Sequence, residues 1–379
     1  MRSVDLIIIG DGLVARALCA GADKLNLDAV RVAPLDLEYQ DDPRSYAISP
    51  SSLKMLNALG VGCAESDRVD GIDIGFGESL LNPLIEISRD QNGVMTMIDH
   101  AVLAGDLLKN LASSSHINGE AGEIIFGDFF VELPKHNIKA PLLIVAAGKA
   151  PQIAKDTGIS FTVEPFYQSA ITAKFLSEVP HDHIARQLFT PHGPMGILPF
   201  GTQGFSIVWS QNQNMADALL AMNDDGFLSH LERIIGDVYG KLAWVSPRAS
   251  FPLSHVQPSR LSRDRMVLIG DSAHGIHPLA GQGVNLGFRD VACLLENLVT
   301  SKRLGLDIGA KPQLNAYVFW RRGDIAKLSE TTKLINKLGK NSGAIIGKAN
   351  DLISLQKMRG LVSFDKVSPQ PELLEGRLP

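Results

Sequence analysis

Cysteines, long apolar runs and surplus charge are all scarce in this chain. The three cysteines (Cys19, Cys63 and Cys293) lie far apart without a CxxC pair, which argues against a disulfide scaffold or a cysteine zinc site and fits a reducing compartment. The longest apolar stretches, such as Leu142–Ala147, fall far short of the roughly 20 residues that span a bilayer. The formal net charge of −5 argues against a nucleic-acid binder. The N-terminus lacks the pattern of a signal peptide, so we expect a cytoplasmic protein.

The sequence does contain several runs typical of buried strands. Its 379 residues suffice for two to three domains, at roughly 100–200 residues each. Apolar runs at Val4–Ile9 and Ala29–Ala33 flank a helix-compatible stretch at Leu13–Leu25, which predicts a parallel β-α-β unit. Short strands joined by Pro and Gly turns predict an antiparallel sheet between residues 167 and 209. A buried strand at Met266–Gly270 then indicates two interleaved domains, the first completed from three separate parts of the chain.

The other elements follow from the same two periodicities. We predict helices at Ser52–Leu59, Asp99–Ser113, Gly283–Thr300 and from about Pro312 onward. We predict strands at Ile124–Leu133, Leu142–Ala147, Gln168–Phe175, Gly196–Phe200 and Phe205–Trp209. There is no internal repeat and no low-complexity tract.

The first candidate site is Gly10–Ala15, which reads G-x-G-x-x-A between the first predicted strand and helix. Gly10 permits a tight turn, Gly12 lets the backbone approach a pyrophosphate, and the small Ala15 allows close packing of helix on strand. The free N–H groups at the start of the helix favour phosphate. We therefore predict dinucleotide binding, with a purely structural turn as the alternative.

This loop lacks one usual partner. An acidic residue that holds ribose hydroxyls is expected about 20 residues further on, and Ala33 stands near that point. Asp36 or Glu38 would have to replace it from the following loop. Asp11 adds negative charge beside the phosphates, which is unfavourable unless its side chain points away.

The second candidate site is the Gly-rich segment Gly270–Gly287, which follows a predicted strand. Asp271 is placed to accept hydrogen bonds from ribitol or ribose hydroxyls. The Pro278–Gly283 turn leads into a helix whose first N–H groups stabilise negative charge, such as that of a reduced flavin. The alternative is a Gly-rich loop with two satisfied histidines. His274 and His277 lack a nearby third ligand, so no metal site is predicted.

Gly270–Gly287 resembles the second flavin motif of class A flavoprotein monooxygenases, in particular that of the ubiquinone-biosynthesis hydroxylase branch. This branch shares the para-hydroxybenzoate hydroxylase fold. The resemblance runs along most of the chain. Its other segments are 42–44, 47–49, 52–53, 167–170, 181–183, Phe189, 193–199, 208–209, 251–253 and 314–324.

The resemblance implies FAD as cofactor and NAD(P)H as co-substrate. Ten positions are predicted to contact the cofactor: Gly10, Gly12, Ala15, Arg44, Asp271, Pro278, Gly281, Gln282, Gly283 and Asn285. Three are predicted to contact substrate: Gln168, Phe200 and His277. Tyr167, Pro199 and Trp209 are interpreted as packing residues.

The family's reaction forms a C4a-hydroperoxide on the reduced flavin, which hydroxylates an electron-rich ring. It requires no protein nucleophile, so no catalytic side chain is predicted. The implied substrate is a polyprenylated phenol or benzoquinol of ubiquinone synthesis. The implied fold is α/β, with a Rossmann-like FAD-binding domain (1–73, 97–160 and 254–305). An antiparallel-sheet substrate domain (74–96 and 161–253) interrupts it, and a C-terminal helical region (306–379) follows.

The chain departs from its family at two acidic anchors. Ala147 stands where relatives carry the Asp of a mid-domain Asp-Gly motif, and Ala33 stands at the ribose position. Near Ala147, Lys149 or Lys155 is the remaining source of a charged side chain. The departures put cofactor affinity and reduction by NAD(P)H in question. Two alternatives stay open: a non-catalytic scaffold of a biosynthetic complex, and a hydroxylase of a soluble phenol.

The segment Ile325–Gly360 carries seven basic and two acidic residues among apolar ones. A basic amphipathic segment of this kind lies on an anionic membrane surface or docks on a partner. We therefore predict peripheral association with the inner face of a membrane or with a ubiquinone-synthesis complex. The alternative is a set of helices that cover the core, with solvated lysines.

Overall fold

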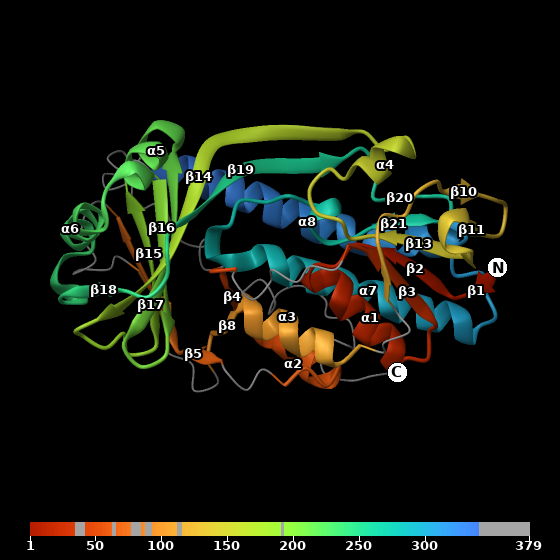
Figure 1. Cartoon of the computed structure of the whole chain (residues 1–379), viewed down its shortest axis with the longest axis horizontal. Coiled ribbons are helices and arrows are strands. Elements are labelled where there is room, and N and C mark those ends of the chain that lie inside the picture. Colours follow the sequence, from red (N-terminus) through yellow and green to blue (C-terminus); the bar gives the residue numbers. More distant parts are fainter. Residues whose placement is uncertain are drawn as a thin grey trace.

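The computed structural model describes residues 1–34, 42–62, 66–76, 85–87, 93–111, 116–190 and 193–340. Figure 1 shows a six-stranded sheet with its helices toward one end and a larger, mostly antiparallel sheet at the other, in which only β15 and β6 of the described strands pair in parallel. The long strands β14 (Phe161–Ser177) and β19 (Ala249–Pro258) run between the two. The positions Asp36, Glu38 and Cys63, and the predicted helices beyond residue 340, lie outside the described residues.

The six-stranded sheet has the order β20-β21-β13-β2-β3-β9. Its strands are β2 (Leu6–Ile9), β3 (Ala29–Ala33), β9 (His116–Asn118), β13 (Leu142–Val145), β20 (Ser262–Arg263) and β21 (Met266–Leu268). All neighbouring pairs are parallel except β20 with β21. Every residue of β2, β3, β13 and β21 is buried, which explains their nearly continuous apolar sequences.

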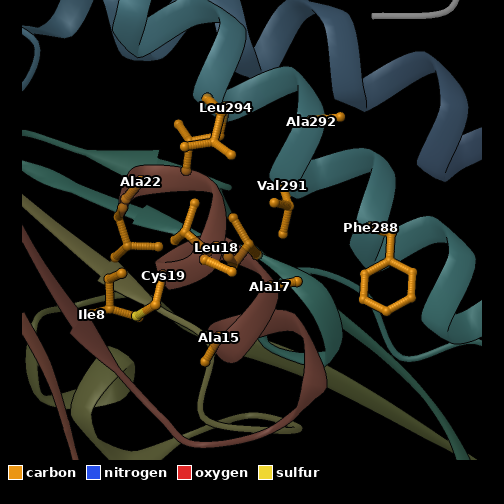
Figure 2. Packing of buried hydrophobic residues seen from close by; sticks show 14 of the residues in the cluster. Ile8, Ala15, Ala17, Leu18, Cys19, Ala22, Phe288, Val291, Ala292 and Leu294 are labelled. Atoms are coloured by element: carbon orange, nitrogen blue, oxygen red, sulfur yellow. The ribbon is translucent and has the colours of Figure 1, made fainter. Parts of the chain in front are cut away.

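Helices cover one face of this sheet. They are α1 (Leu13–Lys24), α2 (Pro50–Ala58), α3 (His100–Lys109), α7 (Gln282–Arg303) and α8 (Lys311–Lys340). Small residues of α1 let α7 approach closely, and a Cβ at Gly21 would lie 2.3 Å from the Leu295 side chain. Figure 2 shows Ala17 and Leu18 of α1 facing Val291 of α7. This packing holds the start of α1 beside the start of α7.

A four-stranded sheet, β1-β12-β11-β10, covers the other face. It consists of β1 (Arg2–Ser3), β10 (Ile125–Phe126), β11 (Val131–Leu133) and β12 (Ile138–Ala140). The prediction of one strand at Ile124–Leu133 is therefore wrong. A turn splits it, in which the Gly127 N–H donates to the Phe130 carbonyl at 2.9 Å, and the halves pair antiparallel. The apolar run hides this turn because Phe129 and Phe130 continue the strand-like composition.

The eight-stranded sheet has the order β18-β14-β17-β16-β15-β6-β7, with β19 paired to β14. Besides β14 and β19 it contains β6 (Gly71–Phe76), β7 (Ile85–Ile87), β15 (Ile184–Thr190), β16 (Gly193–Phe200), β17 (Gly204–Asn212) and β18 (Leu242–Trp244). The predicted antiparallel sheet is confirmed in the pairs β14–β17, β16–β17 and β15–β16. Helices α5 (Gln213–Ala221) and α6 (Asp224–Ile235) cover its outer face.

Smaller elements complete the described chain. The strands β4 (Ser45–Ile48), β5 (Asp67–Val69) and β8 (Met95–Asp99) form a three-stranded sheet. Short helical turns are α4 (Gln152–Asp156), η3 (Pro134–His136), η4 (Gly236–Val238), η5 (Gly270–Ser272) and η6 (Leu279–Gly281). The helices α1 and α7 and the strand β3 lie where we predicted them, to within a few residues. None of the described helices is long and apolar enough to cross a bilayer.

Candidate functional site

The six-stranded sheet reverses its strand order at β2, because β3 and β9 lie on one side of it and β13 and β21 on the other. Ligands of such sheets bind at the carboxyl ends of the strands beside this reversal. A cavity of about 560 Å³ opens there. Its wall includes Gly12 after β2, Ala146 and Gly148 after β13, and Gly270 and Asp271 after β21. The fold thus brings both Gly-rich candidate segments to one cavity.

The two glycines of the first loop have different surroundings. Gly10 has a φ of +126°, and a Cβ there would lie 2.2 Å from the Ala146 carbonyl oxygen, so it packs against the neighbouring strand. Gly12 lines the cavity, and no protein atom lies within 4 Å of a Cβ built on it. Ala15 is fully buried between helix and sheet (Figure 2). Gly12 is therefore the position of this motif that faces the cavity.

Asp11 does not line the cavity. Its carboxylate accepts from Arg16 Nη2 at 2.7 Å and lies 2.9 Å from Arg31 Nε, and all three side chains are buried. Burial lowers the pKa of Arg31, and the charge of Asp11 opposes this shift. The negative charge that seemed unfavourable in the loop is thus neutralised by two arginines. Arg31 gave no signal in the sequence because it stands inside a buried strand.

At Ala33 and Ala147, where relatives carry acidic residues, backbone groups make hydrogen bonds within the protein. The Ala33 carbonyl accepts the Gly119 N–H at 3.1 Å, and His116 Nε2 lies at the same distance. The Ala147 N–H donates to the Ser272 hydroxyl at 2.9 Å, and that hydroxyl donates to the Gly148 carbonyl. Of the two candidate lysines, Lys149 lines the cavity and Lys155 does not.

The second segment contributes another part of the cavity wall. Asp271, Pro278, Gly281 and Gly283 all line the cavity. Gly281 has a φ of +62° and directly precedes α7, whose first turn has no side-chain cap. The N–H groups of that turn lie beside Gly281 and Gly283, at the positive end of the helix dipole.

Asn285 and Gln282 do not line the cavity. Asn285 Nδ2 donates to the Ala47 carbonyl at 2.8 Å, and its Oδ1 accepts the Ser49 N–H at 2.9 Å. These bonds fasten the first turn of α7 to the end of β4. Gln282 is buried. The predicted contact of both residues with cofactor stays a prediction.

Arg44 stands on the cavity wall with two aromatic neighbours, Tyr46 and His100. Arg44 Nε donates to both Asp42 oxygens at 2.9 Å, and Tyr46 Oη lies 3.2 Å from His100 Nδ1. Burial would raise the pKa of Asp42, but the hydrogen bonds and charge of Arg44 outweigh it and lower that pKa. Burial raises the pKa of Tyr46 to about 12, against the opposing charge of Arg44. Tyr46 and His100 were not predicted as site residues, because neither belongs to a recognisable motif.

A buried ionic network lies behind the second segment. Asp290 of α7 accepts the Gly270 N–H at 2.8 Å, lies 2.6 Å from His274 Nε2, and accepts from Arg321 Nε of α8 at 2.7 Å. Burial would raise the pKa of Asp290, but the charges and hydrogen bonds of His274 and Arg321 keep it below its ordinary value. The network ties the Gly270 turn to both helices, and His274 thereby has a structural partner.

The inner face of the eight-stranded sheet forms the remaining wall. Its apolar lining includes Pro194, Leu198, Val208 and Leu253, and Ile276 of the second segment lies beside them. It also carries hydroxyl groups from β14 and β17, at Thr172, Ser206 and Ser210.

The three predicted substrate residues do not line this cavity. Gln168 is buried and accepts from Asn336 Nδ2 of α8 at 3.0 Å. His277 is buried with its ring 5.0 Å from that of Phe166, and Phe200 lies under Lys174 Nζ at 5.6 Å. Their contact with substrate stays a prediction. Trp209 is buried in the core of the eight-stranded sheet, whereas Tyr167 is 79% exposed, which corrects its interpretation as a packing residue.

A family model and full-length relatives identify the same protein family. Residues 130–303 match the family model of an FAD binding domain. The ubiquinone hydroxylase UbiL of Rhodospirillum rubrum is 30% identical, over 98% of this chain and 88% of the relative. The 3-demethoxyubiquinol 3-hydroxylase of Escherichia coli is 28% identical, over 85% of this chain and 86% of the relative.

Solved structures share the fold at lower identity. PqsL from Pseudomonas aeruginosa superposes with a TM-score of 0.78 at 16% identity, over 91% of this chain and 99% of that one. The p-nitrophenol 4-monooxygenase PnpA from Pseudomonas putida gives 0.74 at 15% identity, over the whole of both chains. The chain therefore belongs to the class A FAD-dependent monooxygenases, in the family that includes the ubiquinone hydroxylase UbiL.

Proposed function

We propose that this protein hydroxylates the aromatic ring of a prenylated phenol in ubiquinone biosynthesis, with NAD(P)H as reductant. NAD(P)H supplies two electrons, one oxygen atom of O₂ enters a ring C–H bond, and the other leaves as water. The observation that carries the proposal is the single cavity between both Gly-rich segments and a largely apolar sheet face. Likeness to ubiquinone hydroxylases along nearly the whole chain supports the substrate class.

The cavity suits FAD on the protein's own geometry. Gly12 and Gly283 both line it, and a Cβ built on either glycine would have no protein atom within 4 Å, so backbone faces open space on two sides. Gly12 and the start of α1 would hold the pyrophosphate. Asp271 would accept from ribitol hydroxyls, and the predicted cofactor residue Arg44 lies on the same wall. None of these proposed contacts with FAD requires an acidic residue at position 33 or 147.

Bound FAD would supply the redox chemistry and the activation of oxygen. The chain's own residues bind, orient and shield. The first turn of α7 presents N–H groups that stabilise negative charge beside Gly281 and Gly283. The apolar side chains Leu198, Leu253 and Ile276 exclude water from the space next to that turn.

The apolar wall favours a prenylated ring over a small soluble phenol. A prenyl group gains free energy by leaving water, at about 25 cal/mol per Å² of buried apolar surface. The residues Pro194, Leu198, Val208 and Leu253 offer such a surface on the sheet side of the cavity.

Purified protein should carry a visible flavin band that bleaches when NADPH or NADH is added without oxygen. Readmission of O₂ with a prenylated phenol should give a product that carries oxygen from labelled O₂, measured by mass spectrometry. If the protein hydroxylates a soluble phenol but no prenylated phenol, the alternative of a soluble-phenol hydroxylase is favoured. A colourless protein that cannot be reconstituted with FAD would contradict the enzyme and point to a scaffold.

Peripheral membrane association is proposed from the basic segment that includes the end of α8. Lys337 is exposed there, whereas Lys333 Nζ pairs with Glu164 at 2.8 Å. Replacing Lys333, Lys337 and Lys340 by Glu should reduce co-sedimentation with anionic vesicles, since each basic residue near such a surface contributes about 1 kcal/mol. Neutral vesicles serve as the control. Unchanged co-sedimentation would contradict membrane binding by this segment.

A further inference from the structure

Three hydroxyl groups form a row on the inner face of the strands β14 and β17. In the register of this pair, Ala170 lies opposite Ser210, Thr172 opposite Val208, and Lys174 opposite Ser206. Side chains two residues apart share a face, so Thr172 sits diagonally between the two serines. All three hydroxyl residues line the cavity, although they are only 6%, 5% and 2% exposed for Thr172, Ser206 and Ser210.

The central hydroxyl of the row, Thr172 Oγ1, is buried and has no hydrogen-bond partner among the described residues. A buried polar group without a partner destabilises a protein, and native structures keep few of them. The opposite face of the same strands is apolar, with Ile171 and Ile207 in the core against α5 and α6. Valine or alanine would fit the inner face equally well if it only had to pack. The unpaired Thr172 hydroxyl, with a serine on either side of it along the cavity wall, therefore points to a ligand that completes it.

We infer that Thr172, Ser206 and Ser210 bind the oxygen substituents of the substrate ring and so determine which ring carbon is presented for hydroxylation. This inference rests on the proposed function and specifies its substrate. A hydroxyl both donates and accepts, so the row suits phenol and methoxy oxygens alike. Val208 lies between the serines, and it leaves an apolar surface beside the row for the ring itself.

The charges around the row select a neutral ring over a benzoate. Two cations near the row are already paired: Lys174 Nζ with Asp99 Oδ2 at 2.7 Å, and Arg44, whose guanidinium lies 5.4 Å from the ring of Phe251 on the neighbouring strand, with Asp42. Lys174 does not line the cavity. A buried carboxylate needs a charged partner, which the row does not offer. The chemical class is thus a neutral phenol, methoxyphenol or quinol that carries an apolar chain.

The test compares two probes that differ by one oxygen, 2-geranylphenol and geranylbenzene. Their dissociation constants for the FAD-loaded protein are measured from the change in flavin absorbance, without NAD(P)H. Thr172→Val should weaken 2-geranylphenol about 5- to 50-fold and leave geranylbenzene unchanged, because only the phenol loses a hydrogen bond. Thr172→Ser keeps a hydroxyl and should restore phenol binding. Val208→Ala is the matched apolar control and should weaken both probes alike.

The outcomes separate this inference from the proposed function. If wild-type protein binds phenol and Thr172→Val weakens both probes equally or neither, the hydroxyl row is not the recognition site. If Thr172→Val lowers the urea midpoint, the hydroxyl has a structural role and the inference also fails. If wild-type protein binds neither probe, the proposed prenylated-phenol substrate fails instead. A third probe, 2-geranylbenzoate, tests the charge preference: if wild-type protein binds it more tightly than 2-geranylphenol, the preference for a neutral ring is wrong.

Discussion

Replacing Gly12 by alanine is expected to weaken FAD binding about 10- to 100-fold, because overfilling a packed contact costs about 1–3 kcal/mol. Gly12 lines the cavity at a φ of −71°, which alanine adopts without strain, and no protein atom would touch the new methyl group. The free energy of unfolding of the apoprotein should therefore stay unchanged. Titration of apoprotein with FAD and urea unfolding measure the two quantities separately.

Gly10→Ala is the matched control, two residues away in the same loop. Its Cβ would meet the Ala146 carbonyl oxygen at 2.2 Å, and its φ of +126° is strained for alanine. We expect a loss of about 3 kcal/mol or more in the free energy of unfolding, with or without FAD. Unchanged FAD affinity in Gly12→Ala would contradict the placement of the cofactor against this loop.

Asp290→Asn is expected to lower the free energy of unfolding by about 3 kcal/mol, because it removes the buried charge that Arg321 and His274 share and leaves Arg321 with Asp324 as its remaining carboxylate. Arg321, Asp290 and His274 are at most 2% exposed, so water cannot replace the lost charge. The Gly270 turn depends on the same carboxylate, so FAD affinity should fall as well. Urea unfolding of the apoprotein and FAD titration test both effects.

The pH dependence of this effect has a definite sign. The pKa of Asp290 lies below its ordinary value of 3.8, so the carboxylate stabilises the fold above that pH. The stabilisation is lost as the pH falls through the lowered pKa, and the variant and wild type should then converge. The exposed pair Asp5–Lys302 is the control, and Asp5→Asn should cost less than about 1 kcal/mol. If Asp290→Asn and Asp5→Asn lower the free energy of unfolding equally, burial does not make the Asp290 network stronger than an exposed pair.

Local pattern was sufficient for the elements whose signals lie within a few residues of one another. The apolar run of β3 and the helical spacing of α1 predict their limits to within one residue. Both Gly-rich segments stand out because a tight turn between strand and helix restricts the choice of residue. Local pattern failed at Ile124–Leu133, where the turn at Gly127 lies inside an apolar stretch.

The α/β elements, the two Gly-rich segments and the family could all be predicted from the sequence, because they depend on neighbouring residues in a recognisable order. Contacts between distant parts of the chain were needed to show that Arg16 and Arg31 neutralise Asp11, and that Asn285 joins the start of α7 to β4. The tertiary structure was likewise needed to show that three hydroxyls of β14 and β17 meet at one wall. Such contacts join residues that are far apart in the chain, and strand pairing and helix packing set their distances.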